Sequence, residues 1–170
     1  LPGILYNGDV TPDLIGTDLA VMCNGNPSVK QRVYKELSRA GFSFPTIVHH
    51  SCEVSPLATL EDGVVISPQS IVSPNAMIGK LTYLNFSCGI GHDALVGDFV
   101  QMSPGSQLGG FTKIGNQVSI GSGSTTLQGV SIGNGATVAS GAVVFSNVSE
   151  GSTVMGNPGK RMSAFDKNLK

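Results

Sequence analysis

The stretch SCGIGHDALVG (residues 87–97) holds the two side chains of this sequence that are best suited to chemistry. It places His92 directly before Asp93 among small and aliphatic residues, and the chain has only two other histidines, His49 and His50. A neutral imidazole accepts a proton near neutral pH, and a carboxylate beside it orients the ring and stabilises its charged form. The pair therefore suits a general base with a helper. A solvated turn residue is the alternative, and the elements around His92 decide between them.

A six-residue repeat runs along the chain from Val48 and sets the position of His92. Counting in sixes from Val48 to Glu150 gives 18 positions, of which all but Thr126 and Glu150 are aliphatic or Met. The positions four later are all small or β-branched. A period of six fits neither a helix nor a plain amphipathic strand and is typical of a parallel β-helix, in which three hexads form a triangular coil. We expect about six coils between residues 48 and 155, without a slip in phase.

The repeat predicts which side chains point inward. The aliphatic first position and the small fifth position fill the interior, and the fourth position is often Gly, Asn or Asp, which tolerate the left-handed backbone of a corner. His92 and Asp93 are third and fourth in their hexad, so we expect them at an exposed corner. Cys88 and Cys52 occupy fifth positions and are expected to be core residues, not nucleophiles. The following glycines are expected to leave room for a ligand: Gly91, Gly97, Gly109 and Gly110.

Composition and spacing indicate neither a metal site nor a nucleic-acid or membrane partner. His50 and His92 are seven hexads apart, which is not a multiple of three, so they occupy different corners and different levels, and only a subunit interface could bring them to one metal. We expect the pair His49–His50 to be a junction feature of the first coil. A net charge of −1 offers no basic field for nucleic acid, and no apolar run approaches the ~20 residues of a membrane span. Three cysteines without a CxxC motif favour a reducing, cytoplasmic location.

The first 46 residues follow a different pattern, that of a small α/β piece. GNPSVKQRVYKELSRAGF predicts a helix with Asn26 as N-cap, Pro27 in its first turn and Gly41 as its stop. Its expected apolar stripe consists of Val29, Val33 and Leu37. DLAVMC (18–23) predicts a buried strand, and GILYNG (3–8) a second one. At the other end, GNPGKRM (156–162) closes the repeat, and its two basic residues are either solvated or available to phosphates.

The hexapeptide run, GHD within NFSCGIGHDALVGDFV, the following SPGSQLGG and the closing GNPGKRM together resemble the left-handed β-helix acyltransferases. The sequence is most similar to their sugar group, the UDP-4-amino-sugar N-acetyltransferases and the sialic acid O-acetyltransferase-like proteins. The resemblance covers about residues 43–162 and implies a mainly β fold. It divides the chain into a partial α/β nucleotide-sugar-binding domain (1–46), a left-handed β-helix acyltransferase domain (47–157) and a C-terminal tail (158–170). ILYNGDVTPDLIG resembles a loop that contacts the nucleotide in this group.

The resemblance also implies an activity and roles for individual residues. It implies transfer of an acetyl group from acetyl-CoA to the amino group of a nucleotide-linked amino sugar, without a metal, in a homotrimer with clefts between adjacent β-helices. His92 acts as the base with Asp93 as its helper, and the N–H of Gly110, one coil beyond His92, stabilises the oxyanion. O-acetylation of a sugar or serine hydroxyl, and a non-enzymatic β-solenoid, stay open as alternatives. The expected CoA-binding residues are Gly121, Ser122, Lys160 and Arg161, and the expected sugar-nucleotide contacts are Asp9 and Asn85.

Overall fold

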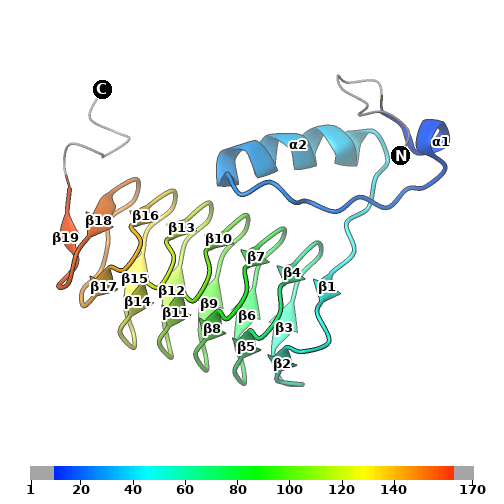
Figure 1. The fold of residues 1–170 in the computed structure, drawn as a ribbon. Helices are drawn as coiled ribbons and strands as arrows, with labels where there is room; N and C mark the ends of the chain where they lie inside the picture. The colour runs from blue at the N-terminus through cyan, green and yellow to red at the C-terminus, as the bar shows by residue number, and fades with distance from the viewer. Residues whose placement is uncertain (1–9, 163–170) are drawn as a thin grey trace.

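The structure is a computed structural model that describes residues 10–162. Most of this part of the chain is a stack of short parallel strands, with one long helix beside the stack (Figure 1). Strands pair with those three hexads further along the chain, as Ile47 does with Val65 and Gln101 with Ser119. Each coil therefore contains three strands and three corners. The predicted left-handed parallel β-helix of about six coils, behind a small N-terminal piece, is confirmed.

The strands form three sheets, one on each face of a triangular prism. All pairs are parallel except the last, β18 with β19, which is antiparallel. The first sheet contains β1 (Ile47–Val48), β4 (Val65–Ile66), β7 (Tyr83–Leu84), β10 (Gln101–Met102), β13 (Ser119–Ile120), β16 (Thr137–Val138), β18 (Thr153–Met155) and β19 (Lys160–Arg161). The second contains β2 (Glu53–Val54), β5 (Ile71–Val72), β8 (Gly89–Ile90), β11 (Gln107–Leu108), β14 (Thr125–Thr126) and β17 (Val143–Val144). The third contains β3 (Thr59–Leu60), β6 (Met77–Ile78), β9 (Leu95–Val96), β12 (Lys113–Ile114) and β15 (Ser131–Ile132).

The corners line up into three edges, each named here after the sheet that it follows. Their order along the chain fixes which residues can lie together, since residues one coil apart stack on the same edge. The first edge contains residues 85–87, 103–105 and 121–123; the second contains 73–75, 91–93, 109–111 and 127–129; the third contains 61–63, 79–81, 97–99 and 115–117.

The interior and the corners follow the predicted hexad positions. First-position residues such as Ile66 and Ile90 and fifth-position residues such as Ala76 are buried in one continuous core. The fourth position has positive φ in most coils, at six of the predicted glycines and also at Asn75 and Asp93. The same left-handed backbone occurs at bulkier residues that the repeat did not single out, namely Gln69, Leu81, Ser87, Phe99, Phe111 and Gln117.

The expectation of an unbroken phase is wrong in the last coil. Thr137 pairs with Thr153, whereas an unbroken repeat would pair it with Met155, and Ile132 forms a bridge with Val148 in place of Glu150. Val148 therefore takes the inward place that the repeat assigned to Glu150, and Glu150 is exposed.

The slip also changes the role of Asn147. This residue loses its place as a left-handed corner residue, and its Oδ1 instead accepts a hydrogen bond from the Ser131 N–H at 2.8 Å. The side chain thereby ties the shortened last coil to the coil before it.

The predicted helix is confirmed as α2 (Pro27–Arg39), which follows the short helix α1 (Pro12–Ile15). The Asn26 side chain caps it by accepting hydrogen bonds from the N–H groups of Ser28 and Val29, and Pro27 opens the first turn, where no N–H is needed. Within residues 10–162, no helix is long and apolar enough to cross a membrane.

The predicted buried strand at residues 18–23 is wrong. Only Leu19 forms a bridge there, a single parallel one with Ser43, and Leu19 and Val21 are about half exposed. Met22 alone is buried, and it joins the aromatic cluster under α2. Residues 18–23 therefore form an extended segment, of which Met22 packs into the cluster under α2. GILYNG (3–8), Asp9 and the end of the predicted tail lie outside the described residues.

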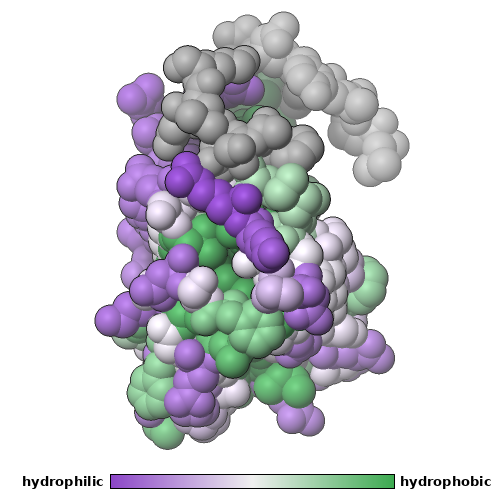
Figure 2. Space-filling model, turned by 90° about the vertical axis from the view of Figure 1, so that its left-hand side faces the viewer, coloured by the Kyte–Doolittle hydropathy of each residue, from purple (hydrophilic) through white to green (hydrophobic). Residues whose placement is uncertain are grey.

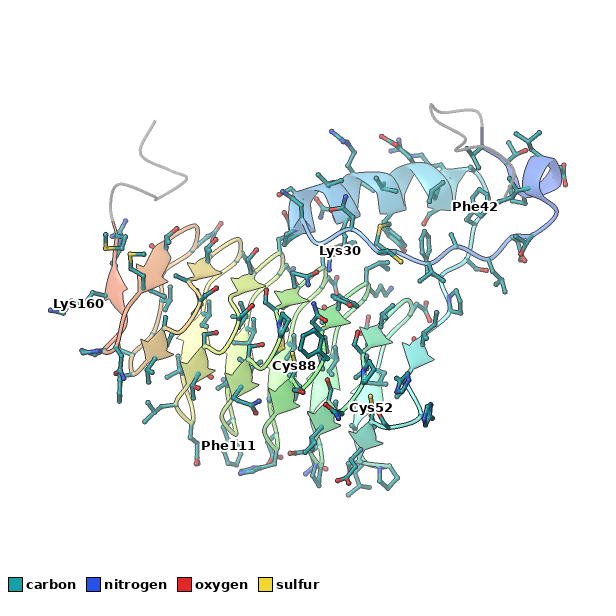
Figure 3. All side chains as sticks on the ribbon, in the orientation of Figure 1. Lys30, Phe42, Cys52, Cys88, Phe111 and Lys160 are labelled. Atoms are coloured by element: carbon teal, nitrogen blue, oxygen red, sulfur yellow. The ribbon has the colours of Figure 1, made fainter. Side chains whose placement is uncertain are left out.

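α2 lies along the third edge and is fixed there by a buried lysine (Figures 1 and 3). The Nζ atom of Lys30 donates hydrogen bonds to the carbonyl oxygens of Leu81 at 3.1 Å and Val100 at 2.9 Å, and the residue is 0% exposed. The corner side chains Leu81 and Phe99 pack around it with residues from the N-terminal piece. Burial lowers the Lys30 pKa from 10.5 to about 8.

Candidate functional site

His92 and Asp93 lie on the second edge, between β8 and β9, as the repeat predicts. Their side chains are 51% and 36% exposed, so both stand at the surface of the prism. Asp93 adopts φ +56°, the left-handed conformation required at the fourth position, and its N–H donates to the carbonyl of Pro74 one coil below. The corner backbone thereby turns the two adjacent side chains towards each other.

A hydrogen bond shows which nitrogen of the His92 ring faces Asp93. His92 Nδ1 lies 2.9 Å from Asp93 Oδ2, and Asn75 Nδ2, one coil below, donates to Asp93 Oδ1 at 3.2 Å. The bonds to His92 and then to Asn75 lower the pKa of the Asp93 carboxyl, which is therefore ionised at neutral pH and only accepts. Nδ1 must then carry the proton. In the neutral ring this leaves Nε2 with its lone pair free.

The free nitrogen of the ring lies over bare backbone one coil further on. A Cβ atom placed on Gly110 would be 2.6 Å from His92 Nε2 and 2.8 Å from Cε1, so the ring occupies the space that a side chain would need. The Phe111 ring meets the imidazole edge to face, with centroids 4.9 Å apart and planes at 89°. Within residues 10–162, neither His92 Nε2 nor the N–H of Gly110 has a hydrogen-bond partner.

Two hollows lie on the two sheets that meet at this edge. One lies over the second sheet and reaches Gly91, and the other lies over the third sheet between Met77 and Leu95. Further along the same edge, Phe111, Leu127 and Phe145 are 50%, 42% and 54% exposed, a row of apolar side chains beyond His92. The site can thus present a base and an unpaired N–H to a ligand. The part of the chain that the structure describes contains no cluster of three metal-ligating side chains.

The other predicted site residues do not share this edge. Asn85, Gly121 and Ser122 lie on the first edge, where Asn85 Oδ1 accepts the N–H of Phe86 at 2.9 Å. Asp9 lies outside the described residues, so its expected contact is not placed.

Lys160 and Arg161 form β19 at the C-terminal end of the coils, and Figure 3 shows Lys160 pointing away from the stack. Figure 2 looks onto this end, where hydrophobic side chains fill the middle and hydrophilic ones surround them. Val144, Val148, Val154 and Arg161 line a hollow there. The two predicted cationic residues are therefore brought to one place, on a different part of the prism from His92.

The glycines expected to leave room for a ligand have different roles. A Cβ at Gly91 would collide with the backbone N of Gly110, and one at Gly109 would lie 2.6 Å from the N of Gln128. Gly97 and Gly121 are limited in the same way by the coil that follows each of them. Close stacking of coils therefore explains these glycines, and the expectation of open space around them is wrong. At Gly110 the three nearest atoms all belong to one side chain, the His92 ring.

Both cysteines of the repeat point inward, as predicted. Cys88 is 1% exposed, and its Sγ lies 3.3 Å from the carbonyl oxygen of Ser103 (Figure 3). Burial raises the pKa of the Cys88 thiol, so no thiolate faces the site. Cys52 is partly buried and bonds the carbonyl of Ser67. His49 and His50 stack on each other at the first coil with centroids 4.2 Å apart, as expected for a junction.

Two contacts of His92 and Asp93 went unpredicted, those with Phe111 and Asn75. Asn75 carried a readable signal, because it lies one coil before Asp93 and both are at a fourth position. Phe111 also carried one, since a bulky aromatic residue stands where the repeat prefers Gly, Asn or Asp.

Comparison with known proteins connects this architecture to transferases. Residues 111–146 match the family model described as bacterial transferase hexapeptide (six repeats). The chain is similar to the acetyltransferase domain of PglB from Neisseria gonorrhoeae FA1090, with 31% identity and a TM-score of 0.82 over 84% of this chain and 69% of that one. The same PglB domain also has a structure in complex with acetyl coenzyme A.

Two further solved structures have similar coils and a similar extent. A mutant of perosamine N-acetyltransferase from Caulobacter crescentus, in complex with CoA and GDP-perosamine, is 25% identical with a TM-score of 0.87, over 89% of this chain and 72% of that one. WeeI from Acinetobacter baumannii AYE is 26% identical with a TM-score of 0.83, over 85% of this chain and 70% of that one.

Proposed function

The chain belongs to the left-handed β-helix sugar acetyltransferases of the hexapeptide-repeat family, and on that premise we propose that it transfers an acetyl group from acetyl-CoA to the amino group of a nucleotide-linked amino sugar. The neighbours that carry acetyl coenzyme A, or CoA with GDP-perosamine, support this donor and this class of acceptor. The observation that carries the proposal is the second edge, where Asp93 holds an imidazole with a free Nε2 over a backbone N–H that also lacks a partner among the described residues.

The proposed reaction is a direct transfer. His92 Nε2 accepts a proton from the sugar amine as the amine nitrogen attacks the thioester carbonyl carbon, and Asp93 stabilises the imidazolium that forms. The Gly110 N–H donates to the carbonyl oxygen as it becomes an oxyanion. The tetrahedral intermediate collapses with cleavage of the C–S bond, and the CoA sulfur leaves as a thiol with the proton from His92. The products are the N-acetylated sugar nucleotide and CoA.

Buried Cys88 supports direct transfer over an acyl-cysteine route, because the thiol faces the core and its pKa is raised. Lys160 and Arg161 meet the phosphates of CoA in this scheme, and Gly121 and Ser122 line its pantetheine arm. Asn85 contacts the acceptor, and Asp9 contacts the nucleotide.

Residues assigned to one cleft lie on two different edges of the prism, which supports a homotrimer. His92 and Gly110 lie on the second edge, whereas Asn85, Gly121 and Ser122 lie on the first. On one prism the second sheet separates the two edges, and two neighbouring prisms can bring them together in one cleft. Apolar side chains exposed beside the His92 edge, such as Met77 and Leu95, give such an interface material to bury. The enzyme works in the cytoplasm in this proposal, in keeping with free cysteine thiols at positions 23, 52 and 88.

Ligand-induced stabilisation and a transfer screen test the proposal together. We expect CoA to raise the melting temperature, and UDP or GDP to add a separate rise, because a ligand that binds only the folded state stabilises it. Acetyl-CoA is then offered with UDP- and GDP-linked 4-amino sugars and with hydroxyl acceptors, and CoA release is followed. Turnover with hydroxyl acceptors alone, and no effect of either nucleotide, indicates O-acetylation. No stabilisation by CoA and no transfer to any acceptor leaves only the solenoid.

A further inference from the structure

Three bulky side chains occupy corner positions where the backbone is left-handed. Leu81, Phe99 and Phe111 have φ values of +55°, +58° and +57°. A residue with a large side chain pays a conformational penalty in this region, which Gly and Asn largely avoid. Because the coil imposes this backbone on most fourth positions, each bulky residue there needs a compensating interaction.

For Leu81 and Phe99, packing under α2 compensates for the strained backbone. They are 1% and 7% exposed and belong to the cluster that holds the N-terminal piece on the third edge. Phe111 differs, because it is half exposed and projects from an edge of the coils (Figure 3). Its one aromatic partner in residues 10–162 is the imidazole of His92. The contact that accounts for Phe111 therefore lies at the candidate base.

The imidazole needs such a contact to keep its orientation. Its side chain is half exposed, and the bond from Nδ1 to Asp93 fixes one atom but leaves the ring able to swing about that atom. Gly110 supplies a flat surface under Nε2 without holding it. The Phe111 ring, at 89° to the imidazole, closes off a direction in which the ring could turn.

We propose that Phe111 is a positioning residue, which holds the His92 ring so that Nε2 stays over Gly110. This inference rests on the proposed function, in which that nitrogen takes the proton of the acceptor. Phe111 touches neither proton nor acyl group in this scheme, and it acts on the rate through His92.

The variant Phe111→Asn tests the inference, because its melting temperature and its kcat are expected to respond differently. Asn adopts positive φ readily, so we expect an unchanged or higher melting temperature. Loss of an edge-to-face aromatic pair corresponds to about tenfold in rate, so we expect kcat to fall about tenfold while KM for acetyl-CoA stays within about twofold. Phe111→Tyr retains the ring and should restore kcat. Phe145→Asn, the same exchange at another exposed residue of this edge, is the matched control and should leave kcat unchanged.

Diethyl pyrocarbonate labelling reads the ring directly, without turnover. It acylates accessible imidazole nitrogens, and mass spectrometry separates His92 from His49 and His50, which serve as internal references. We expect Phe111→Asn to raise the labelling rate of His92 relative to the other two, and Phe145→Asn to leave the ratio unchanged.

The outcomes separate the two proposals. An active wild-type enzyme, an inactive His92→Ala variant and a Phe111→Asn variant with kcat within twofold of wild type would overturn the positioning role alone. A raised KM with unchanged kcat would also overturn it, because Phe111 would then contact the ligand. A wild-type protein without transfer to any acceptor would refute the proposed function and the effect on rate, and the labelling ratio would still decide whether Phe111 holds the ring.

Discussion

Replacing Gly110 by Ala adds one methyl group at the point where the His92 ring rests on the backbone. Gly110 lacks the positive φ that would strain an alanine, so the change acts through space alone. The new Cβ would lie 2.6 Å from Nε2, 2.8 Å from Cε1 and 3.0 Å from Cδ2 of His92. Since ordinary contact needs about 3.4–4 Å, the ring must retreat by about 1 Å.

A retreat of this size should cost catalysis far more than stability. The ring is tethered to Asp93 at 2.9 Å and bordered by Phe111, so it cannot move away as a rigid unit without losing one of these contacts. Misplacement of a catalytic group by 1 Å lowers rates about 10²-fold, so we expect kcat to fall by about that factor. The ring is half exposed, so we expect the melting temperature to change by no more than about 2 °C, corresponding to less than about 1 kcal/mol.

The assay is steady-state CoA release with the best acceptor from the transfer screen, combined with thermal unfolding of the same samples. Gly91→Ala is the informative contrast, because its Cβ collides with the backbone at Gly109 and Gly110. Backbone cannot yield as a side chain does, so this variant should lose about 1–3 kcal/mol of unfolding free energy. Gly25→Ala meets only the Gln101 side chain at 3.9 Å and should be neutral in both measurements. A Gly110→Ala enzyme with kcat within threefold of wild type would refute the placement of the base.

Three further predictions concern the base, the buried thiol and the buried lysine. His92→Ala should lower kcat at least 10²-fold with the fold intact by circular dichroism, and near-normal turnover would exclude His92 as the base. Cys88→Ala should retain most activity, because the thiol is in the core with a raised pKa, and acetylated Cys88 found by mass spectrometry would contradict direct transfer. Lys30 has its pKa lowered to about 8 by burial, so between pH 8 and 10.5 the unfolded chain holds a proton that the folded chain has released. The free energy of unfolding should therefore rise across this window by up to about 3 kcal/mol from this group. In urea titrations Lys30→Met should lack that part of the rise, and equal pH dependence in both proteins would show that Lys30 does not titrate as stated.

The repeat predicted the coils because the six-residue period also fixes which strands pair, namely those three hexads apart. Nearly every hexad puts one aliphatic side chain inside, so three hexads fix both the number of strands in a coil and the partner of each strand. The slip in the last coil escaped prediction because Val148 and Val154 also read as acceptable fifth-position residues. Glu150 at an aliphatic position was the visible sign of it, since a carboxylate is not placed in an apolar core without a partner.

The N-terminal piece was less predictable because its packing comes from contacts distant in sequence. The helix was clear from its cap and its stripe, which are local. An apolar run such as residues 18–23 fits a strand and an extended segment equally well. In the structure it is an extended segment, in which Met22 packs into the cluster that contains Phe99. Lys30 had no local signal at all. Its burial depends on two carbonyl groups, of Leu81 and Val100, that corners of the β-helix turn towards α2.

On this edge, the stacking of the coils does not explain why residue 110 is a glycine. At Gly91 and Gly109, which are second in their hexads, the backbone of the following coil lies where a Cβ would be. Gly110 is third, and on the same edge the third position holds Pro74 one coil before His92 and Gln128 one coil after Gly110. A side chain therefore fits the third position as far as the coils are concerned. What needs the space at Gly110 is the His92 ring, and this links the composition of the edge to the placement of its base.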